Sequence, residues 1–123
     1  MPARILIVED ESDLARVMAA WLAKRGRAFH HAPDAETAFR KFRRETHALV
    51  IIDVVLPGMS GLELLRIIRS ESQVPVLMMS GSTSPAHRQQ AMKLGAHAFL
   101  RKPFTPAALE LAVRKALAFG VSV

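Results

Sequence analysis

Polar side chains that could carry out phosphoryl transfer follow four of the five short apolar runs in this sequence. They are three carboxylates, a serine-glycine pair and a lysine: Glu9 and Asp10, Asp53, Ser80 and Gly81, and Lys102. If the runs are parallel strands, their carboxyl ends meet at one edge of a sheet, where open α/β proteins bind their ligands. The spacing therefore predicts a single site built from residues far apart in the sequence.

The three carboxylates indicate a metal ion at this edge. Glu9, Asp10 and Asp53 would repel one another at neighbouring strand ends unless a cation lay between them. Oxygen ligands without cysteine favour a hard ion. Mg²⁺ fits, because it takes few carboxylates, keeps several waters and binds phosphate oxygens. The sequence thus predicts a Mg²⁺ site that also receives a phosphoryl donor.

Asp53 is the best candidate for a nucleophile that accepts the phosphoryl group. The apolar run 49–52 fixes its backbone, and the turn expected at 56–58 keeps its carboxylate accessible. Lys102 can neutralise a phosphoryl oxygen, and Ser80 offers a hydroxyl donor. The glycine after Ser80 lets backbone amides approach a bound anion.

The elements that must position these groups follow from hydrophobic periodicity. Apolar runs of strand length alternate with amphipathic stretches of helical length, which predicts five helices covering both faces of a doubly wound, five-stranded parallel sheet. The expected strands are Ile5–Val8, Ala28–His31, Leu49–Asp53, Val76–Met79 and Ala98–Leu100. The fold class is therefore α/β.

The first helix is predicted most clearly, because five apolar residues recur at helical spacing. We expect one buried stripe made of Leu14, Val17, Met18, Trp21 and Leu22. Ser12 is positioned to cap the start of this helix, and Gly26 can end it in a left-handed conformation.

Capping residues also mark the ends of the other helices. The predicted caps are Asp34, Ser60 with Glu63 at capping-box spacing, Ser84 before Pro85, and Thr105 before Pro106. Gly95 and Gly120 are expected to close the last two helices.

The composition limits the possible classes of protein. The chain has 123 residues, of which 50% are hydrophobic, so we expect one domain over residues 1–123. The absence of cysteine excludes disulfides and thiolate metal sites, and suits the cytoplasm. Its apolar runs are too short to cross a bilayer, so we expect no membrane association.

A formal net charge of +6 could indicate a nucleic-acid partner. The basic residues are spread over several segments, however, and no aromatic residues interleave with them as stacking platforms. Solvated helix faces are the better interpretation. A basic nucleic-acid-binding α/β module remains a minor alternative, to be tested by salt-dependent binding to a duplex.

The order of the motifs strongly resembles the receiver domain of bacterial two-component response regulators, over essentially the whole chain. The matching segments are Glu9-Asp10, residues 53–61, Ser80-Gly81 and Lys102-Pro103-Phe104. The resemblance implies a flavodoxin-like sheet with strand order 2-1-3-4-5. It also implies a signalling switch in which Asp53 accepts a phosphoryl group from a histidine kinase or a histidine phosphotransfer protein.

The resemblance assigns further roles at the metal site. It implies that Asp10 and Asp53 bind Mg²⁺ directly, that Glu9 acts through water and that the backbone carbonyl of Val55 is another ligand. The backbone of Val54 and of the glycine after Ser80, Gly81, would hold the phosphoryl group.

The resemblance also implies a switch formed by Ser80 and Phe99. Ser80 turns toward the acyl phosphate, and Phe99 turns inward and rearranges the face made by the fourth helix, fifth strand and fifth helix. This face would control an effector protein or domain, or form a homodimer on phosphorylation. Phe99 lacks the hydroxyl of the tyrosine frequent at this position, so its contacts would be apolar.

The implied protein is a phosphoacceptor that assists its own phosphorylation and dephosphorylation, not an enzyme with a separate substrate. Val55 brings no polar group to orient an attacking water, which predicts slow dephosphorylation. The enzymatic alternative is an aspartate-nucleophile phosphatase of the haloacid dehalogenase type. That family places a second aspartate two residues after the nucleophile, where this chain has Val55. A flavodoxin-like flavin binder is disfavoured by the acidic loop 9–12.

Five histidines remain outside this site. His30 and His31 are adjacent, as in some metal or phosphohistidine sites, but no carboxylate is near them in the sequence and strand alternation directs them to opposite faces. A structural role is the expectation. His47, His87 and His97 fall at expected helix ends or loops, where surface histidine is common.

Overall fold

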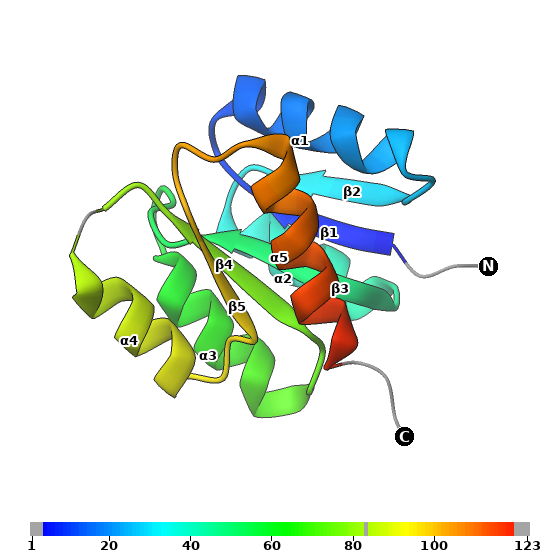
Figure 1. Ribbon diagram of the computed structural model, residues 1–123. Helices are drawn as coiled ribbons and strands as arrows, with labels where there is room; N and C mark the ends of the chain where they lie inside the picture. The colour runs from blue at the N-terminus through cyan, green and yellow to red at the C-terminus, as the bar shows by residue number, and fades with distance from the viewer. Residues whose placement is uncertain (1–3, 83, 120–123) are drawn as a thin grey trace.

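The computed structural model describes residues 4–82 and 84–119, in which strands and helices alternate (Figure 1). The elements are β1 (Arg4–Val8), α1 (Ser12–Lys24), β2 (Phe29–Ala32), α2 (Ala35–Arg44), β3 (His47–Asp53), α3 (Gly61–Glu71), β4 (Val76–Ser80), α4 (Pro85–Lys93), β5 (Ala98–Arg101) and α5 (Pro106–Ala118). None of the helices in this described part is long and apolar enough to cross a membrane.

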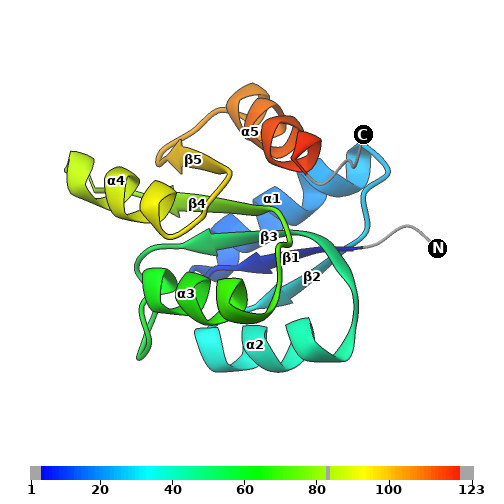
Figure 2. The ribbon, with the colours of Figure 1, turned by 90° about the horizontal axis from the view of Figure 1, so that it is seen from below.

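All five strands form one parallel sheet in the order β2-β1-β3-β4-β5. Helices α1 and α5 cover one face, and α2, α3 and α4 cover the other (Figure 2). The predicted fold class and strand order are therefore confirmed. Because every strand runs the same way, the carboxyl ends lie together on the left of Figure 1.

Strand β3 shows why the central strands are continuous apolar runs. Val50 and Ile52 pack in the core under α2 and α3, whereas Leu49 and Ile51 pack in the core under α1 and α5. All four side chains are fully buried. A strand covered on both faces has no solvent side, so it shows no polar alternation. This packing fixes the backbone that leads to Asp53.

The predicted helix caps at four positions are confirmed by hydrogen bonds from backbone amides to the cap side chains. The bonds run from Thr37 to Asp34 (2.7 Å), from Glu63 to Ser60 (3.2 Å), from Ala86 to Ser84 (3.2 Å) and from Ala108 to Thr105 (3.1 Å). Gly26 and Gly95 have φ of 74° and 102°, the left-handed region that favours glycine at a helix end. Gly120 lies outside the described residues.

Two predictions for the first helix are wrong. Ser12 is the first helical residue and not the cap, which is Glu11, and no side-chain capping bond is found there among the described residues. Val17 is 56% exposed, because the buried stripe is centred on Ala15, Met18 and Leu22. Each helical position rotates the side chain by about 100°, so Val17 turns away from the sheet while its neighbour Met18 faces it.

Strand boundaries differ from the predictions by one or two residues. β2 begins and ends one residue later than expected, at Phe29 and Ala32, and β3 begins at His47. His47 pairs with Arg4 of β1, so β3 begins two residues before the predicted start. The polar side chain of His47 hides this start in the sequence. β4 and β5 each extend one residue further, to Ser80 and Arg101.

Candidate functional site

The carboxyl ends of β1, β3, β4 and β5 bring together the side chains that the sequence analysis singled out. Lys102, just after β5, forms an ion pair with Glu9, just after β1, at 2.8 Å between Nζ and Oε2. The same ammonium hydrogen-bonds and pairs with Asp53 Oδ2, at the end of β3. Lys102 comes 93 residues after Glu9 and 49 residues after Asp53 in the sequence, yet it contacts both.

Burial makes this cluster electrostatically unusual. Glu9 has no exposed surface and Asp53 is 4% exposed. Burial and the hydrogen bond with Asp53 raise the pKa of Glu9 to about 7, although Lys102 and the amide of Glu11 act in the opposite direction. Burial lowers the pKa of Lys102, but Asp53 and Glu9 more than offset it, so the pKa is raised and the ammonium stays charged.

The donor set fits a hard divalent cation. Glu9, Asp10 and Asp53 each offer a carboxylate oxygen, and these oxygens lie within 4.8 Å of one another. Glu9 and Asp53 are buried, whereas Asp10 is exposed. A single ammonium faces two buried carboxylates here, which leaves excess negative charge for a cation to balance. All-oxygen ligands favour Mg²⁺ over transition metals.

The loop after β3 positions Asp53 by close backbone packing. The amide of Val55 donates to Asp53 Oδ1 at 3.0 Å, and the amide of Gly61 donates to the carbonyl of Val54 at 2.8 Å. Gly58 turns the loop with a φ of 74°. The resemblance included Gly61 without a role, and the structure supplies one, because the first residue of α3 lies against the end of β3.

Ser80, fully buried at the end of β4, lies beside the first turn of α4. Its Oγ accepts a hydrogen bond from the amide of Ser82 at 3.1 Å and lies 3.2 Å from His87 Nδ1. Gly81 is exposed and Val54 is buried. The contact with His87 was not predicted from the sequence, since nothing in the local pattern indicates that this side chain turns inward.

The comparisons with known proteins decide the family. The sequence model for the response regulator receiver domain matches residues 5–114. This chain belongs to that family.

Curated relatives agree with the assignment. The chain is 36% identical over 104 residues to the regulatory protein VanRB of Enterococcus faecalis, covering 85% of the chain and 47% of the relative. It is 34% identical over 116 residues to the sensory transduction protein RegX3 of Mycolicibacterium smegmatis, covering 94% of the chain and 51% of the relative. The receiver domain thus spans about half the length of these relatives.

Solved structures show the same architecture. A CheY-like receiver domain protein from Methanospirillum hungatei superposes with a TM-score of 0.90 at 26% identity, covering 98% of this chain and 97% of that one. Chemotaxis protein CheY4 of Vibrio cholerae gives a TM-score of 0.88 at 29% identity, covering 94% and 99%. The chain is accordingly a response regulator receiver domain of two-component systems, and the phosphatase alternative is not supported.

A hollow of about 450 Å³ opens beside Lys102 in the receiver domain. It is lined by Glu11, Leu14, Gly81, Lys102, Pro103 and Phe104. The hollow leaves open space beside the lysine that contacts Asp53.

Phe99 is half-buried in the receiver domain and packs against the core under α2, α3 and α4. It also lines a groove of about 260 Å³ between α4 and α5, together with Met92 and Leu111. Leu111 is 70% exposed and Met92 is 40% exposed. Exposed apolar side chains, with Arg88 and Lys115 beside them, therefore border the aromatic residue that the resemblance assigns to the switch.

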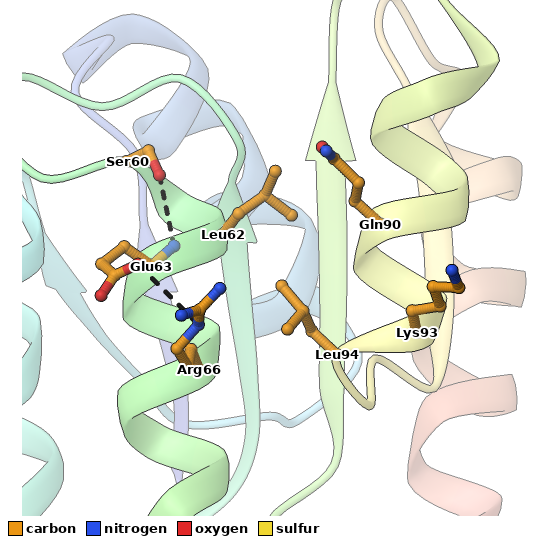
Figure 3. A pocket seen from close by; sticks show the side chains of 7 residues that line it. All are labelled: Ser60, Leu62, Glu63, Arg66, Gln90, Lys93 and Leu94. Atoms are coloured by element: carbon orange, nitrogen blue, oxygen red, sulfur yellow. Dashed lines mark hydrogen bonds and ion pairs between the residues drawn. The ribbon is translucent and has the colours of Figure 1, made fainter.

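A second groove, of about 330 Å³, separates α3 from α4 (Figure 3). Leu62 and Leu94 point into it from the two helices, and Arg66 and Lys93 border it. None of the side chains in the Asp53 cluster lines this groove. It separates the two helices without taking part in the candidate site.

The prediction for His47 is wrong, whereas His87 lies at a helix end and His97 in a loop, as expected. His47 is 6% exposed, as the first residue of β3, so the expectation of a surface position is wrong. His87 and His97 are half-buried, and His97 Nδ1 accepts a hydrogen bond from the amide of Val76 at 3.1 Å. His31 contacts the backbone oxygen of Glu9 at 2.7 Å, in keeping with a structural role.

Proposed function

We propose that Asp53 of this receiver domain accepts a phosphoryl group from the phosphohistidine of a histidine kinase or a histidine phosphotransfer protein. An Asp53 carboxylate oxygen attacks the phosphorus, the phosphorus–nitrogen bond breaks, and the imidazole leaves and takes up a proton. The product is an acyl phosphate. The observation that carries the proposal is the contact of buried Asp53 with Lys102 inside a cluster of three carboxylates.

The neighbouring residues stabilise the charge that develops. Lys102 shifts from the two carboxylates to a phosphoryl oxygen, which its position between them allows. Asp10, Asp53, Glu9 through water and the carbonyl of Val55 would hold Mg²⁺, which would supply positive charge to the phosphoryl oxygens when bound. The backbone amides of Val54 and Gly81 complete the set of donors. The domain thereby assists its own phosphorylation and later dephosphorylation.

The output follows from Ser80 and Phe99. Ser80 leaves His87 and turns toward the acyl phosphate, which releases its contact with α4. Phe99 then moves further inward, and the surface formed by α4, β5 and α5 changes shape. This surface controls an effector protein or domain, or pairs two copies of the chain. Exposed Leu111 and Met92 make such contacts apolar.

We further propose that residues 1–123 form one receiver domain that acts in the cytoplasm and does not itself bind nucleic acid or membranes. Response regulators act with histidine kinases and with downstream effector or DNA-binding domains. Several relatives of about twice this length are named as transcriptional regulators, among them YcbL of Bacillus subtilis, of which the match covers 50%. The effector is either part of a longer protein or a separate partner.

The direct test is incubation with acetyl phosphate and Mg²⁺, followed by intact-mass measurement. One phosphoryl group should be added to the wild type and none to Asp53→Ala. Asp13→Ala is the matched control, because Asp13 is exposed in the first turn of α1 and should leave labelling unchanged. Persistent labelling of Asp53→Ala would refute the assignment.

A further inference from the structure

A second group of metal-binding side chains lies away from the carboxyl ends of the strands. It consists of His30 in β2, Glu45 at the end of α2 and His47 at the start of β3. One possible ligand atom from each lies within 4.8 Å of the others. His47 opens β3 and Asp53 ends it, so the cluster and the phosphoryl site lie at different ends of the same strand (Figure 1).

The spacing of the two imidazoles suits a shared ion. His30 Nδ1 lies 3.3 Å from His47 Nε2. Glu45 Oε2 lies 3.5 Å from the other ring nitrogen of His30, Nε2, so the carboxylate must turn to share an ion with Nδ1. With zinc–nitrogen bonds of about 2.0–2.1 Å, adjacent nitrogens of a tetrahedral site are about 3.4 Å apart. The two rings therefore need little rearrangement to bind one ion. The Glu45 side chain is 48% exposed and free to turn toward it.

The surroundings of His47 prepare it as a ligand. Its ring stacks on Phe42, with centroids 6.3 Å apart and an interplanar angle of 16°, which fixes its orientation. Burial, and then the neighbouring His30, lower the pKa of His47, so the ring is neutral near pH 7 and keeps a lone pair. His47 Nδ1 is buried without a hydrogen-bond partner among residues 4–82 and 84–119. Nε2, the ring nitrogen that faces His30, is the one that can bind an ion.

Arg4 is the competing cation at this cluster. Its guanidinium lies 3.3 Å from Glu45 Oε2. Arg4 and His47 are also opposite each other in the register of β1 and β3. The side chain is 41% exposed, so an arriving ion can displace it into solvent. Metal binding thus exchanges one exposed ion pair, which contributes little to stability, for coordination bonds.

We propose that His30, Glu45 and His47 form a binding site for one borderline divalent metal ion, of which Zn²⁺ fits best, with water completing the tetrahedron. Two nitrogen donors and one carboxylate favour Zn²⁺ over Mg²⁺, which prefers oxygen alone. The ion joins β2, the end of α2 and the start of β3. It therefore stabilises the amino end of the sheet, independently of phosphorylation at Asp53.

The test is calorimetric titration of the tag-free chain with Zn²⁺ in excess Mg²⁺, which occupies the Asp53 cluster. One equivalent should bind, the thermal midpoint should rise, and the ring ¹⁵N resonances of His30 and His47 should shift. His30→Gln and Glu45→Gln should weaken binding roughly tenfold or more. Arg4→Gln should strengthen it by removing the competing charge.

His31→Gln is the matched control, because His31 is adjacent in β2 but contacts the backbone of Glu9 and not the cluster. It should bind Zn²⁺ like the wild type. Circular dichroism without zinc verifies that each variant is folded. Absence of binding at micromolar Zn²⁺, or binding that His30→Gln leaves unchanged and Asp10→Asn abolishes, would overturn the proposal. Absence of binding would mean that the cluster is only a pair of contacting histidines. Binding abolished by Asp10→Asn alone would place the ion beside Asp53.

Discussion

A Cβ atom at Gly61 would overlap the carbonyl oxygen of Asp53 and lie 2.8 Å from its carbonyl carbon. The first residue of α3 therefore touches the backbone of the phosphoacceptor candidate, and only glycine permits this approach. Because the obstructing atoms are backbone, no side-chain rotation can relieve the contact. The position of α3 and the position of Asp53 depend on each other.

Gly61→Ala should accordingly lower the free energy of unfolding by about 2–4 kcal/mol and slow phosphorylation of Asp53. Urea denaturation and labelling with acetyl phosphate measure the two effects. Gly81→Ala is the control for stability, since among the residues that the structure describes its Cβ would meet only Lys102 Cβ at 4.0 Å, an ordinary contact. Equal stability of the two variants would contradict the argument.

Arg69 joins three segments at the other end of α3. Its guanidinium donates to the carbonyls of Ser72 and Val74, each at 2.9 Å, and to that of Gly95 at 2.8 Å. Arg69→Met should lower the unfolding free energy by about 2–4 kcal/mol, because three partly buried carbonyls lose a charged donor. Arg66→Met, at a side chain 67% exposed on the same helix, should change it by about 0.5 kcal/mol or less. Similar urea midpoints for both variants would refute this role.

Glu9 gives the metal-free domain a particular pH dependence. Its pKa rises from an ordinary value of 4.5 to about 7 on folding, so the folded state holds the proton more tightly. The protonated Glu9 side chain therefore contributes its full share of stability below pH 4.5, and this share is lost as the pH rises through about 7. Mg²⁺ should therefore raise the thermal midpoint more at pH 8 than at pH 5.5.

The comparison with Glu9→Gln isolates this effect from other titrating groups. Without divalent ions, the unfolding free energy of the wild type minus that of Glu9→Gln should decrease as the pH rises from 4.5 to about 7. Glu36→Gln, at an exposed site in α2, should show no such trend. An increase with pH in the Glu9 difference would show that its pKa is not raised.

The contact between Ser80 and His87 provides a local reporter of switching. If Ser80 turns toward an acyl phosphate, His87 loses its partner, and its ring resonances should shift when acetyl phosphate and Mg²⁺ are added. Asp53→Ala should abolish the shift. His97, bonded to the amide of Val76, is an internal control whose resonances should stay in place. Unchanged His87 resonances in phosphorylated protein would exclude the movement.

The convergence of Glu9, Asp53 and Lys102 was predictable from the sequence for a topological reason. Each residue ends or follows an apolar run, and parallel strands place such ends at one edge whatever their separation in the chain. The helix starts at Asp34 and Ser60 were equally predictable from the sequence, because a cap acts on amides two or three residues away.

Contacts between distant side chains were not predictable in this way. His30 is 17 residues before His47 in the sequence, yet α2 returns Glu45 and His47 to it. His87 reaches Ser80 only because α4 begins at a particular angle to β4, and the close approach of Gly61 to Asp53 depends on the path of the intervening loop. Periodicity specifies which face a residue occupies but not which side chain it meets there.

Val55 should determine how long the acyl phosphate lasts. It lies two residues after Asp53, its amide bonds Asp53 Oδ1, and it is 66% exposed. We therefore expect its side chain to border the approach of water to a phosphorylated Asp53. An isopropyl group cannot orient that water, whereas an amide can donate and accept hydrogen bonds.

Val55→Asn should therefore accelerate phosphate loss several-fold, timed by intact mass after acetyl phosphate is removed. Because the side chain is exposed, stability should change by about 0.5 kcal/mol or less. Val55→Ala separates orientation of the water from simple access to it, since alanine opens space without adding a polar group. Acceleration by asparagine alone supports an orienting role. Equal acceleration by both variants would mean that Val55 acts by shielding Asp53, and no acceleration by asparagine would remove this position from control of the lifetime.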